Sequence, residues 1–173
     1  LGSLVRVRFA IYGAGAIGAY LGAKLAIAGE DVALIARGPH LAAMQAHGVR
    51  VRAADGDFEA HPQITDDPAQ VGPVDYLVLA VKAHGLTAIA PLLAPLIGPE
   101  TAIVPAQNGI PWWYFHGQGG AWKGTRLETA DPGGIIAAHV PSERVIDCVV
   151  YPAAVIAEPG VIEGGIGAEV SKT

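Results

Sequence analysis

Cysteine is almost absent from this chain, and its scarcity limits the class of protein. The sequence has 173 residues and a single cysteine, Cys148, which has no partner for an internal disulfide. Disulfides belong to secreted domains, so one cysteine and no sign of export predict a reducing, cytoplasmic environment. We expect Cys148 to be a small buried apolar side chain rather than a nucleophile.

The chain also lacks a basic excess and a long apolar run. Its 11 Lys and Arg against 16 Asp and Glu give a formal charge of −5, which disfavours nucleic acid or an anionic membrane as a partner. The mean hydropathy is +0.39. Glycines from Gly13 to Gly18, and Pro91 and Pro95, break the uncharged stretches before they reach the ~20 residues of a membrane span. With 51% hydrophobic residues, the composition predicts one globular domain.

Apolar strand-like runs alternate with helix-like stretches from the beginning of the chain. Strands are expected at residues 5–12, 32–36, 76–81 and 101–105, and helices at 16–28, 39–48 and 83–96. Pro91 and Pro95 predict that the last of these helices is broken or shortened. This alternation predicts an α/β fold with a Rossmann-type, doubly wound, mostly parallel sheet.

Two parts of the chain depart from the alternation. Asp55-Gly56 lies between two short apolar runs and predicts a small antiparallel hairpin. From Gln107 onward, residues 145–150 and 155–162 resemble strands without helices between them. The C-terminal portion is therefore expected to be irregular or antiparallel.

The first turn of the sheet carries a glycine pattern with a chemical meaning. Gly13, Gly15 and Gly18 match G-x-G-x-x-G between an apolar strand and a helix. In dinucleotide-binding proteins the first glycine permits the turn, the second lets the backbone approach a pyrophosphate, and the third allows close helix packing. The helix N-terminus then offers N–H groups to the phosphates. The alternative is a glycine-rich packing turn without a ligand.

The residue that follows the second strand discriminates between the two nicotinamide cofactors. NAD sites place a carboxylate there for the ribose 2′-hydroxyl, whereas an arginine pairs with the 2′-phosphate of NADP. This chain reads Leu34-Ile35-Ala36-Arg37, while Glu30 and Asp31 lie at the opposite end of the strand. The pattern favours NADP(H), although Arg37 could also be an ordinary surface arginine.

Two polar residues follow later strands of the predicted sheet. Lys82 ends the run 76–81, and Asn108 follows the strand 101–105. Ligands of open α/β sheets bind beyond the carboxyl ends of strands, so both residues are candidates for contact with cofactor or substrate. Lys82 could instead be a surface lysine, and Asn108-Gly109 a simple turn.

Other chemically active residues give weaker signals. His84, His116 and His139 lack metal-ligand spacing, and no metal site is predicted. The aromatic run 112–115 is expected to pack in the core or at an interface, with a stacking surface as the alternative.

Several motifs together resemble the N-terminal domain of the ketopantoate reductase (2-dehydropantoate 2-reductase) family. The motifs that carry the resemblance are Ile11–Gly18, Ile35–Arg37, Val81–Ala83, Gln107–Asn108–Gly109, Val149–Ala153 and Glu158–Val161. The resemblance implies NADPH-dependent reduction of the 2-keto group of ketopantoate to pantoate, a step toward pantothenate and coenzyme A.

The resemblance also implies a role for each site residue. It assigns the pyrophosphate to Gly13, Ala14, Gly15, Ala16, Ile17 and Gly18, and the 2′-phosphate to Arg37. Lys82 would lie near the ribose and nicotinamide, Asn108 would contact cofactor and substrate, and the backbone of Ala153 would contact the cofactor.

The family's general acid is a lysine in a following all-helical domain, which also supplies most substrate contacts. Lys172 lies in a different context, so no catalytic residue is expected in this chain. Residues 1–173 are expected to form the NADP-binding domain without the helical substrate domain. A stand-alone NADP-binding or regulatory module, a reductase of another 2-keto acid, and a homodimer remain open.

Overall fold

A five-stranded parallel sheet forms the centre of the molecule. The computed structural model describes residues 6–165. The first sheet contains β1 (Arg8–Tyr12), β2 (Asp31–Ile35), β5 (Gln63–Thr65), β6 (Val74–Leu79) and β7 (Ile97–Pro105). Its strand order is β5-β2-β1-β6-β7 and every neighbouring pair is parallel, which confirms the predicted doubly wound sheet.

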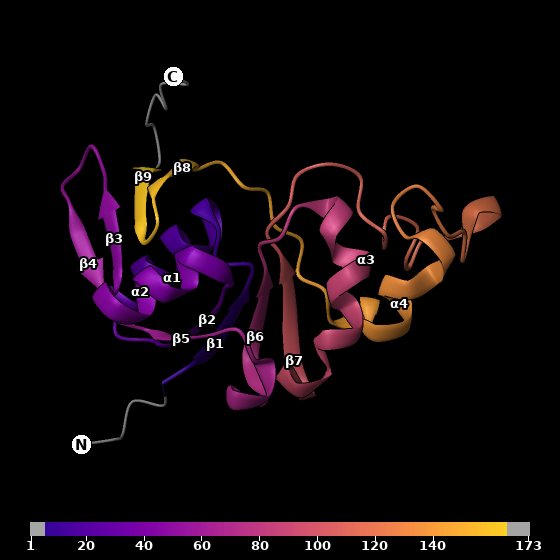
Figure 1. The fold of residues 1–173 in the computed structure, drawn as a ribbon. Coiled ribbons are helices and arrows are strands. Elements are labelled where there is room, and N and C mark those ends of the chain that lie inside the picture. Colours follow the sequence, from indigo (N-terminus) through magenta and orange to yellow (C-terminus); the bar gives the residue numbers. More distant parts are fainter. Residues whose placement is uncertain (1–5, 166–173) are drawn as a thin grey trace, which may run out of the picture.

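Helices cover both faces of this sheet (Figure 1). They are α1 (Ala16–Ile27), α2 (Gly38–His47), α3 (Leu86–Ile89) and α4 (Ile135–His139). Two 3-10 turns, Ala90–Leu92 and Ala94–Leu96, continue α3, because Pro91 and Pro95 cannot donate the hydrogen bonds of a longer α-helix. Further 3-10 turns are Pro68–Gln70, Ala83–Gly85, Gly120–Trp122, Pro132–Gly134 and Ser142–Arg144.

A second, four-stranded sheet lies beside α1. Its order is β4-β3-β9-β8, from β3 (Val49–Arg52), β4 (Phe58–Ala60), β8 (Ala153–Glu158) and β9 (Val161–Gly165). The pairs β3–β4 and β8–β9 are antiparallel and β3–β9 is parallel. The hairpin at Asp55-Gly56 and the antiparallel C-terminal portion are thereby confirmed.

The predicted strands of the C-terminal portion need two corrections. Residues 145–150 form only isolated parallel bridges, one between Val145 and Ile103 of β7 and one between Cys148 and Ala106, the residue after β7. Residues 155–162 are not one strand, because Pro159 and Gly160 turn the chain between β8 and β9, with Gly160 at φ +79.

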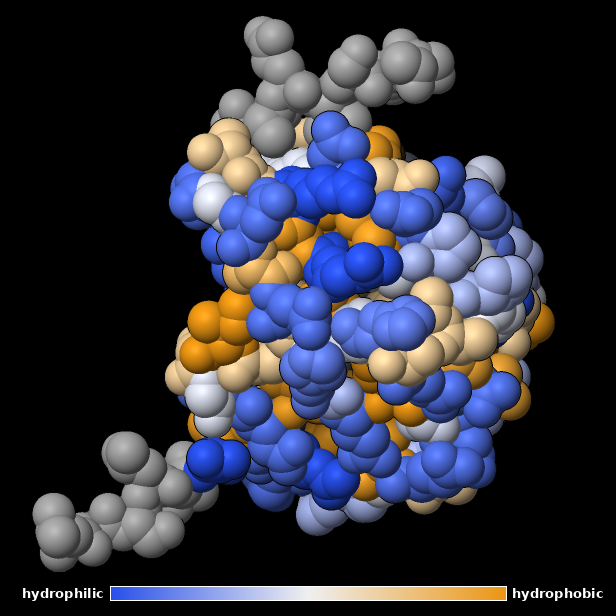
Figure 2. Space-filling model, turned by 60° about the vertical axis from the view of Figure 1, so that its left-hand side comes forward, coloured by the Kyte–Doolittle hydropathy of each residue, from blue (hydrophilic) through white to orange (hydrophobic). Residues whose placement is uncertain are grey.

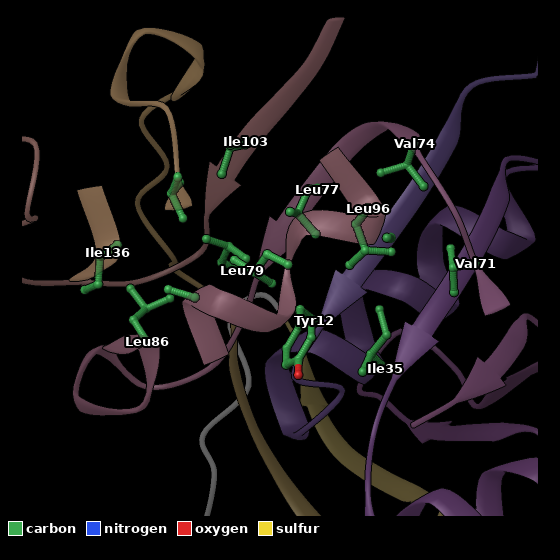
Figure 3. Close-up of a cluster of buried hydrophobic side chains, with 14 of the residues drawn as sticks. Tyr12, Ile35, Val71, Val74, Leu77, Leu79, Leu86, Leu96, Ile103 and Ile136 are labelled. Atoms are coloured by element: carbon green, nitrogen blue, oxygen red, sulfur yellow. The ribbon is translucent and has the colours of Figure 1, made fainter. Parts of the chain in front are cut away.

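Alternate residues of the central strands supply two separate cores. Ala10 and Tyr12 of β1 join the cluster on the α3 side, whereas Ile11 joins the cluster on the α1 side. Figure 3 shows the α3-side cluster, in which Leu79 of β6 lies between Leu77 of the same strand and Leu86 of α3. Burial on both faces explains why these strands read as continuous apolar runs in the sequence.

The side of the molecule that carries β3 and β4 is mostly hydrophilic, with apolar residues in the gaps (Figure 2). Along β3, Val49 and Val51 are buried while Arg50 and Arg52 are exposed. Within residues 6–165, no helix is long and apolar enough to cross a membrane.

Candidate functional site

The turn between β1 and α1 is built on glycines that the packing requires. Gly13 has φ +96, and a Cβ on it would lie 2.6 Å from Cγ1 of Val81. A Cβ on Gly18 would overlap the carbonyl oxygen of Gly13 and lie 3.0 Å from the Cβ of Ala80. These two glycines therefore let α1 begin in close contact with the end of β6.

Gly15 has no such packing requirement. Its φ of −76 and ψ of −157 are ordinary for any residue, and nothing lies within 4 Å of the position its Cβ would take. It is the N-cap of α1 and offers no side chain to the N–H groups of the first turn, Ala16 to Gly18. The protein leaves an open space beside unsatisfied helix N–H groups, which is the arrangement an anionic group needs.

Two backbone hydrogen bonds fix this turn against the end of β2. The N–H groups of Gly13 and Ala14 both donate to the carbonyl oxygen of Ile35, at 3.0 and 2.9 Å. Ile35 is the last residue of β2 and precedes Ala36 and Arg37. The glycine turn and Arg37 consequently lie at the same edge of the sheet, where its strands end; we call this the carboxyl edge.

Arg37 is an exposed residue at the N-cap of α2. Its guanidinium forms no ion pair with any of residues 6–165. Burial raises the pKa of the Tyr12 hydroxyl, and the positive charge of Arg37 acts in the opposite direction. Arg37 therefore lies near the end of β1 with its donors available to an anion.

The sheet also brings two carboxylates to this edge that the sequence did not suggest. β5 runs parallel to β2, with Thr65 opposite Ile35, and the N–H of Ala36 donates to the carbonyl oxygen of Thr65 at 3.0 Å. Asp66 and Asp67 follow Thr65 and are exposed. Asp67 caps the next turn by accepting from the N–H of Ala69 at 2.9 Å, which leaves Asp66 as the carboxylate that could compete with Arg37.

Lys82 lies at the carboxyl edge on the other side of the glycine turn. It is exposed and follows Val81, the residue that Gly13 approaches. The side-chain amide of Gln107 donates to the carbonyl oxygen of Val81 at 2.5 Å and so links the ends of β6 and β7. This bond holds the backbone from which Lys82 projects, a structural role for Gln107 that the sequence did not suggest.

Asn108 has a structural task that the sequence did not reveal. Its amide nitrogen donates to the carbonyl oxygen of Val150 at 3.1 Å, and its amide oxygen accepts from the N–H of Val150 at 3.0 Å. The side-chain amide thus pairs with the backbone of Val150 as a neighbouring strand residue would, and it holds the segment before β8 in place. One N–H and one lone pair of the amide remain for a ligand.

Ala153 begins β8 and is exposed. It pairs with Gly165 of β9, and its carbonyl oxygen lies where a Cβ on Gly164 would otherwise sit. β8 lies beside α1, the helix that follows the glycine turn. The predicted site residues therefore come from both sheets.

Other predicted features lie outside this arrangement. Among residues 6–165, no three His, Cys, Asp or Glu side chains are grouped as a metal site would require. His84, His116 and His139 are exposed, and Cys148 is half-buried. Trp112 is buried in the α3-side core, whereas Trp113 donates to Asp147 at 2.7 Å.

A hollow of about 370 Å³ occupies the opposite edge of the sheet, where β2 begins. Glu30, Asp31 and Glu59 line it together with Arg6 and His61. Three carboxylates against one guanidinium make this hollow a poor place for a phosphate group. The carboxyl edge is the better candidate.

Comparisons with known proteins identify the family of this chain. The family model described as Ketopantoate reductase PanE/ApbA matches residues 9–111. A 2-dehydropantoate 2-reductase of Mesorhizobium japonicum is 50% identical over 90% of this chain and 48% of its own length. A structure from Ralstonia solanacearum MolK2, provisionally described as a ketopantoate reductase, has a TM-score of 0.87 and 42% identity over 94% of this chain and 50% of that one.

A further solved structure is D-mandelate dehydrogenase with NADH and anilino(oxo)acetate, at 25% identity and a TM-score of 0.71, over 91% of this chain and 45% of that one. The chain spans about half the length of these relatives. The matched residues include the glycine turn, Arg37, Lys82 and Asn108. The chain belongs to the ketopantoate reductase PanE/ApbA family.

Proposed function

We propose that this chain is the NADP(H)-binding part of a reductase that converts a 2-keto acid, ketopantoate in the first instance, into the 2-hydroxy acid. The observation that carries the proposal is the open space at Gly15, beside the N-terminus of α1 and on the same sheet edge as Arg37. Packing accounts for Gly13 and Gly18 but not for Gly15. A backbone that must approach a pyrophosphate does account for it.

The residues of the carboxyl edge fit such a cofactor from one end to the other. The pyrophosphate would lie against the turn Gly13 to Gly18, held by the free N–H groups of its last three residues at the start of α1. Arg37 would pair with the 2′-phosphate. Lys82, Asn108 and the backbone of Ala153 would bind the ribose and nicotinamide half. The chain carries a net charge of −5, so this local group of donors must provide the attraction.

Reduction of a 2-keto acid also requires a proton donor. NADPH, when bound, supplies a hydride to the keto carbon. The 2-hydroxyl is complete only when its oxygen receives a proton. The remaining N–H of the Asn108 amide could orient the substrate, but an amide does not release a proton at neutral pH. We propose that a lysine in a helical part of the full-length reductase supplies it.

Two 2-keto acids are candidate substrates. The Mesorhizobium relative is a 2-dehydropantoate 2-reductase, which favours ketopantoate as the substrate. The single cysteine favours the cytoplasm as the compartment. The similarity to D-mandelate dehydrogenase favours a second candidate, a 2-keto acid with an aromatic side chain. The proposed cofactor site would serve either acid, and the part of the protein that binds the substrate side chain would choose between them.

Cofactor choice is tested by the dissociation constants of NADPH and NADH. We expect the 173-residue chain to bind NADPH more tightly, and Arg37→Ala to weaken NADPH binding by about 10- to 100-fold with little effect on NADH. Arg50→Ala, an exposed arginine of β3, is the matched control. The contrary result would be a wild-type chain that binds NADH more tightly than NADPH, with Asp66→Asn shifting this preference toward NADPH. That result would assign the ribose 2′-hydroxyl to Asp66 instead of the 2′-phosphate to Arg37.

Turnover is tested in a chain extended to the length of the Mesorhizobium relative. Loss of NADPH absorbance on adding ketopantoate supports the proposed reaction. If NADPH absorbance falls only when the keto acid that corresponds to mandelate is added, the second candidate is supported. An extended chain that binds NADPH and reduces neither acid would favour a module without turnover.

A further inference from the structure

A histidine in the first turn of α2 connects three segments that are far apart in the sequence. His40 lies one turn after Arg37, and its Nδ1 accepts a hydrogen bond from the N–H of Gly160 at 3.0 Å. Gly160 lies 120 residues later, in the turn between β8 and β9. The ring also lies against the backbone of Ala14, in the glycine turn.

The hairpin turn that meets His40 is fixed from two further sides. A Cβ on Gly160 would lie 3.1 Å from the Cβ of Ala43, so only a glycine lets the turn approach α2 this closely. The carbonyl oxygen of Gly160 accepts from the N–H of Arg50 in β3 at 3.0 Å. These contacts give a structural role to the run Glu158–Val161, to which no cofactor contact is assigned.

The protonation of the ring matches this arrangement. Burial lowers the pKa of His40 below its usual value, while the contact with Ala14 acts in the opposite direction. A neutral ring that accepts at Nδ1 carries its proton on Nε2. Within residues 6–165 that Nε2 is buried and lacks a hydrogen-bond partner of ordinary geometry, so the Nδ1 bond to Gly160 is the polar tie that fixes the ring.

We propose that His40 is a positioning residue for cofactor selectivity: it ties the first turn of α2, and with it Arg37, to the β8–β9 hairpin through the bond to Gly160. Arg37 itself makes no ion pair with residues 6–165 that would hold it in place. Its N-cap position is therefore set by the first turn of α2. The same tie connects the 2′-phosphate end of the site to the strand that carries Ala153, on the nicotinamide side. This inference rests on the proposed NADP(H)-binding function.

The experiment measures dissociation constants of NADPH and NADH for the wild-type chain, His40→Ala, His40→Asn and His47→Ala. The Asn Oδ1 takes the place of Nδ1 and keeps the acceptor for Gly160. His47 lies exposed at the other end of α2 and is the matched control. We expect His40→Ala to reduce the preference for NADPH over NADH about tenfold, as for the loss of one hydrogen bond, and His40→Asn to restore it. His47→Ala should leave the preference unchanged.

A purely structural histidine would give a different pattern. If His40→Ala weakens both cofactors by the same factor, or if His40→Asn fails to restore the preference, the positioning role is wrong. Amide hydrogen exchange gives an independent reading: Gly160 should exchange quickly in His40→Ala and slowly in the wild type and His40→Asn. A wild-type chain without a preference for NADPH would instead refute the proposed function, and the inference with it.

Discussion

The two glycines at the start of α1 give the sharpest contrast between packing and ligand binding. In Gly15→Ala the added methyl group meets no protein atom within 4 Å, and the backbone angles of Gly15 suit alanine. Alanine caps a helix less well than glycine but restricts the unfolded chain. The free energy of unfolding should therefore change by less than about 1 kcal/mol.

Gly18→Ala places the same methyl group against the carbonyl oxygen of Gly13 and 3.0 Å from the Cβ of Ala80. Neither neighbour is the end of a flexible side chain, so α1 must move away from β6. Overpacking of this kind lowers the free energy of unfolding by about 1–3 kcal/mol. Urea denaturation followed by circular dichroism measures both variants against the wild type.

Gly15→Ala should change cofactor binding strongly although it changes stability little. Its methyl group occupies the space proposed for the pyrophosphate, so Gly15→Ala should weaken NADPH binding at least about tenfold, or about 1.4 kcal/mol. Titration calorimetry measures this. A Gly15→Ala chain of normal stability that binds NADPH like the wild type would show that the open space is not the cofactor site.

Two further predictions concern the ties that hold the site. Asn108→Ala removes both hydrogen bonds to Val150, so the Val150 amide should exchange much faster, with a loss of about 1 kcal/mol in stability because the site is exposed. The lowered pKa of His40 predicts an effect of pH on stability. The usual pKa of histidine is 6.5, so as the pH falls below 6.5 the ring takes up a proton in the unfolded chain before it does so in the folded chain. The free energy of unfolding should fall from pH 6.5 down to the folded pKa and then level off. His40→Asn should lack this decline; an identical decline in the variant would assign it to other groups.

Local chemistry made much of the fold predictable from the sequence. The glycine turn, the helix opened by Pro39 and the break after α3 each follow from backbone preferences of a few neighbouring residues. The apolar runs of β1 and β6 indicate burial on both faces, and burial on both faces is typical of a parallel sheet. Such signals do not depend on distant parts of the chain.

The remaining features depend on contacts between distant residues. The bonds of Asn108 to Val150 span 42 residues, and the bond of His40 to Gly160 spans 120. Asp66 reaches the edge that carries Arg37 only because β5 pairs with β2, which no local pattern indicates. The motif assigns different roles to Gly15 and Gly18, but the free space beside Gly15 and the close contacts at Gly18 become known only from the packed neighbours.

The most direct test of the cofactor site is a nuclear magnetic resonance titration of the ¹⁵N-labelled chain with NADPH. The amide signals of Ala16, Ile17 and Gly18 should shift most, followed by those near Arg37, because these are the N–H groups left free for the proposed phosphates. Unshifted signals at the glycine turn, with changes confined to the hollow around Asp31 at the opposite edge of the sheet, would contradict the proposed cofactor site.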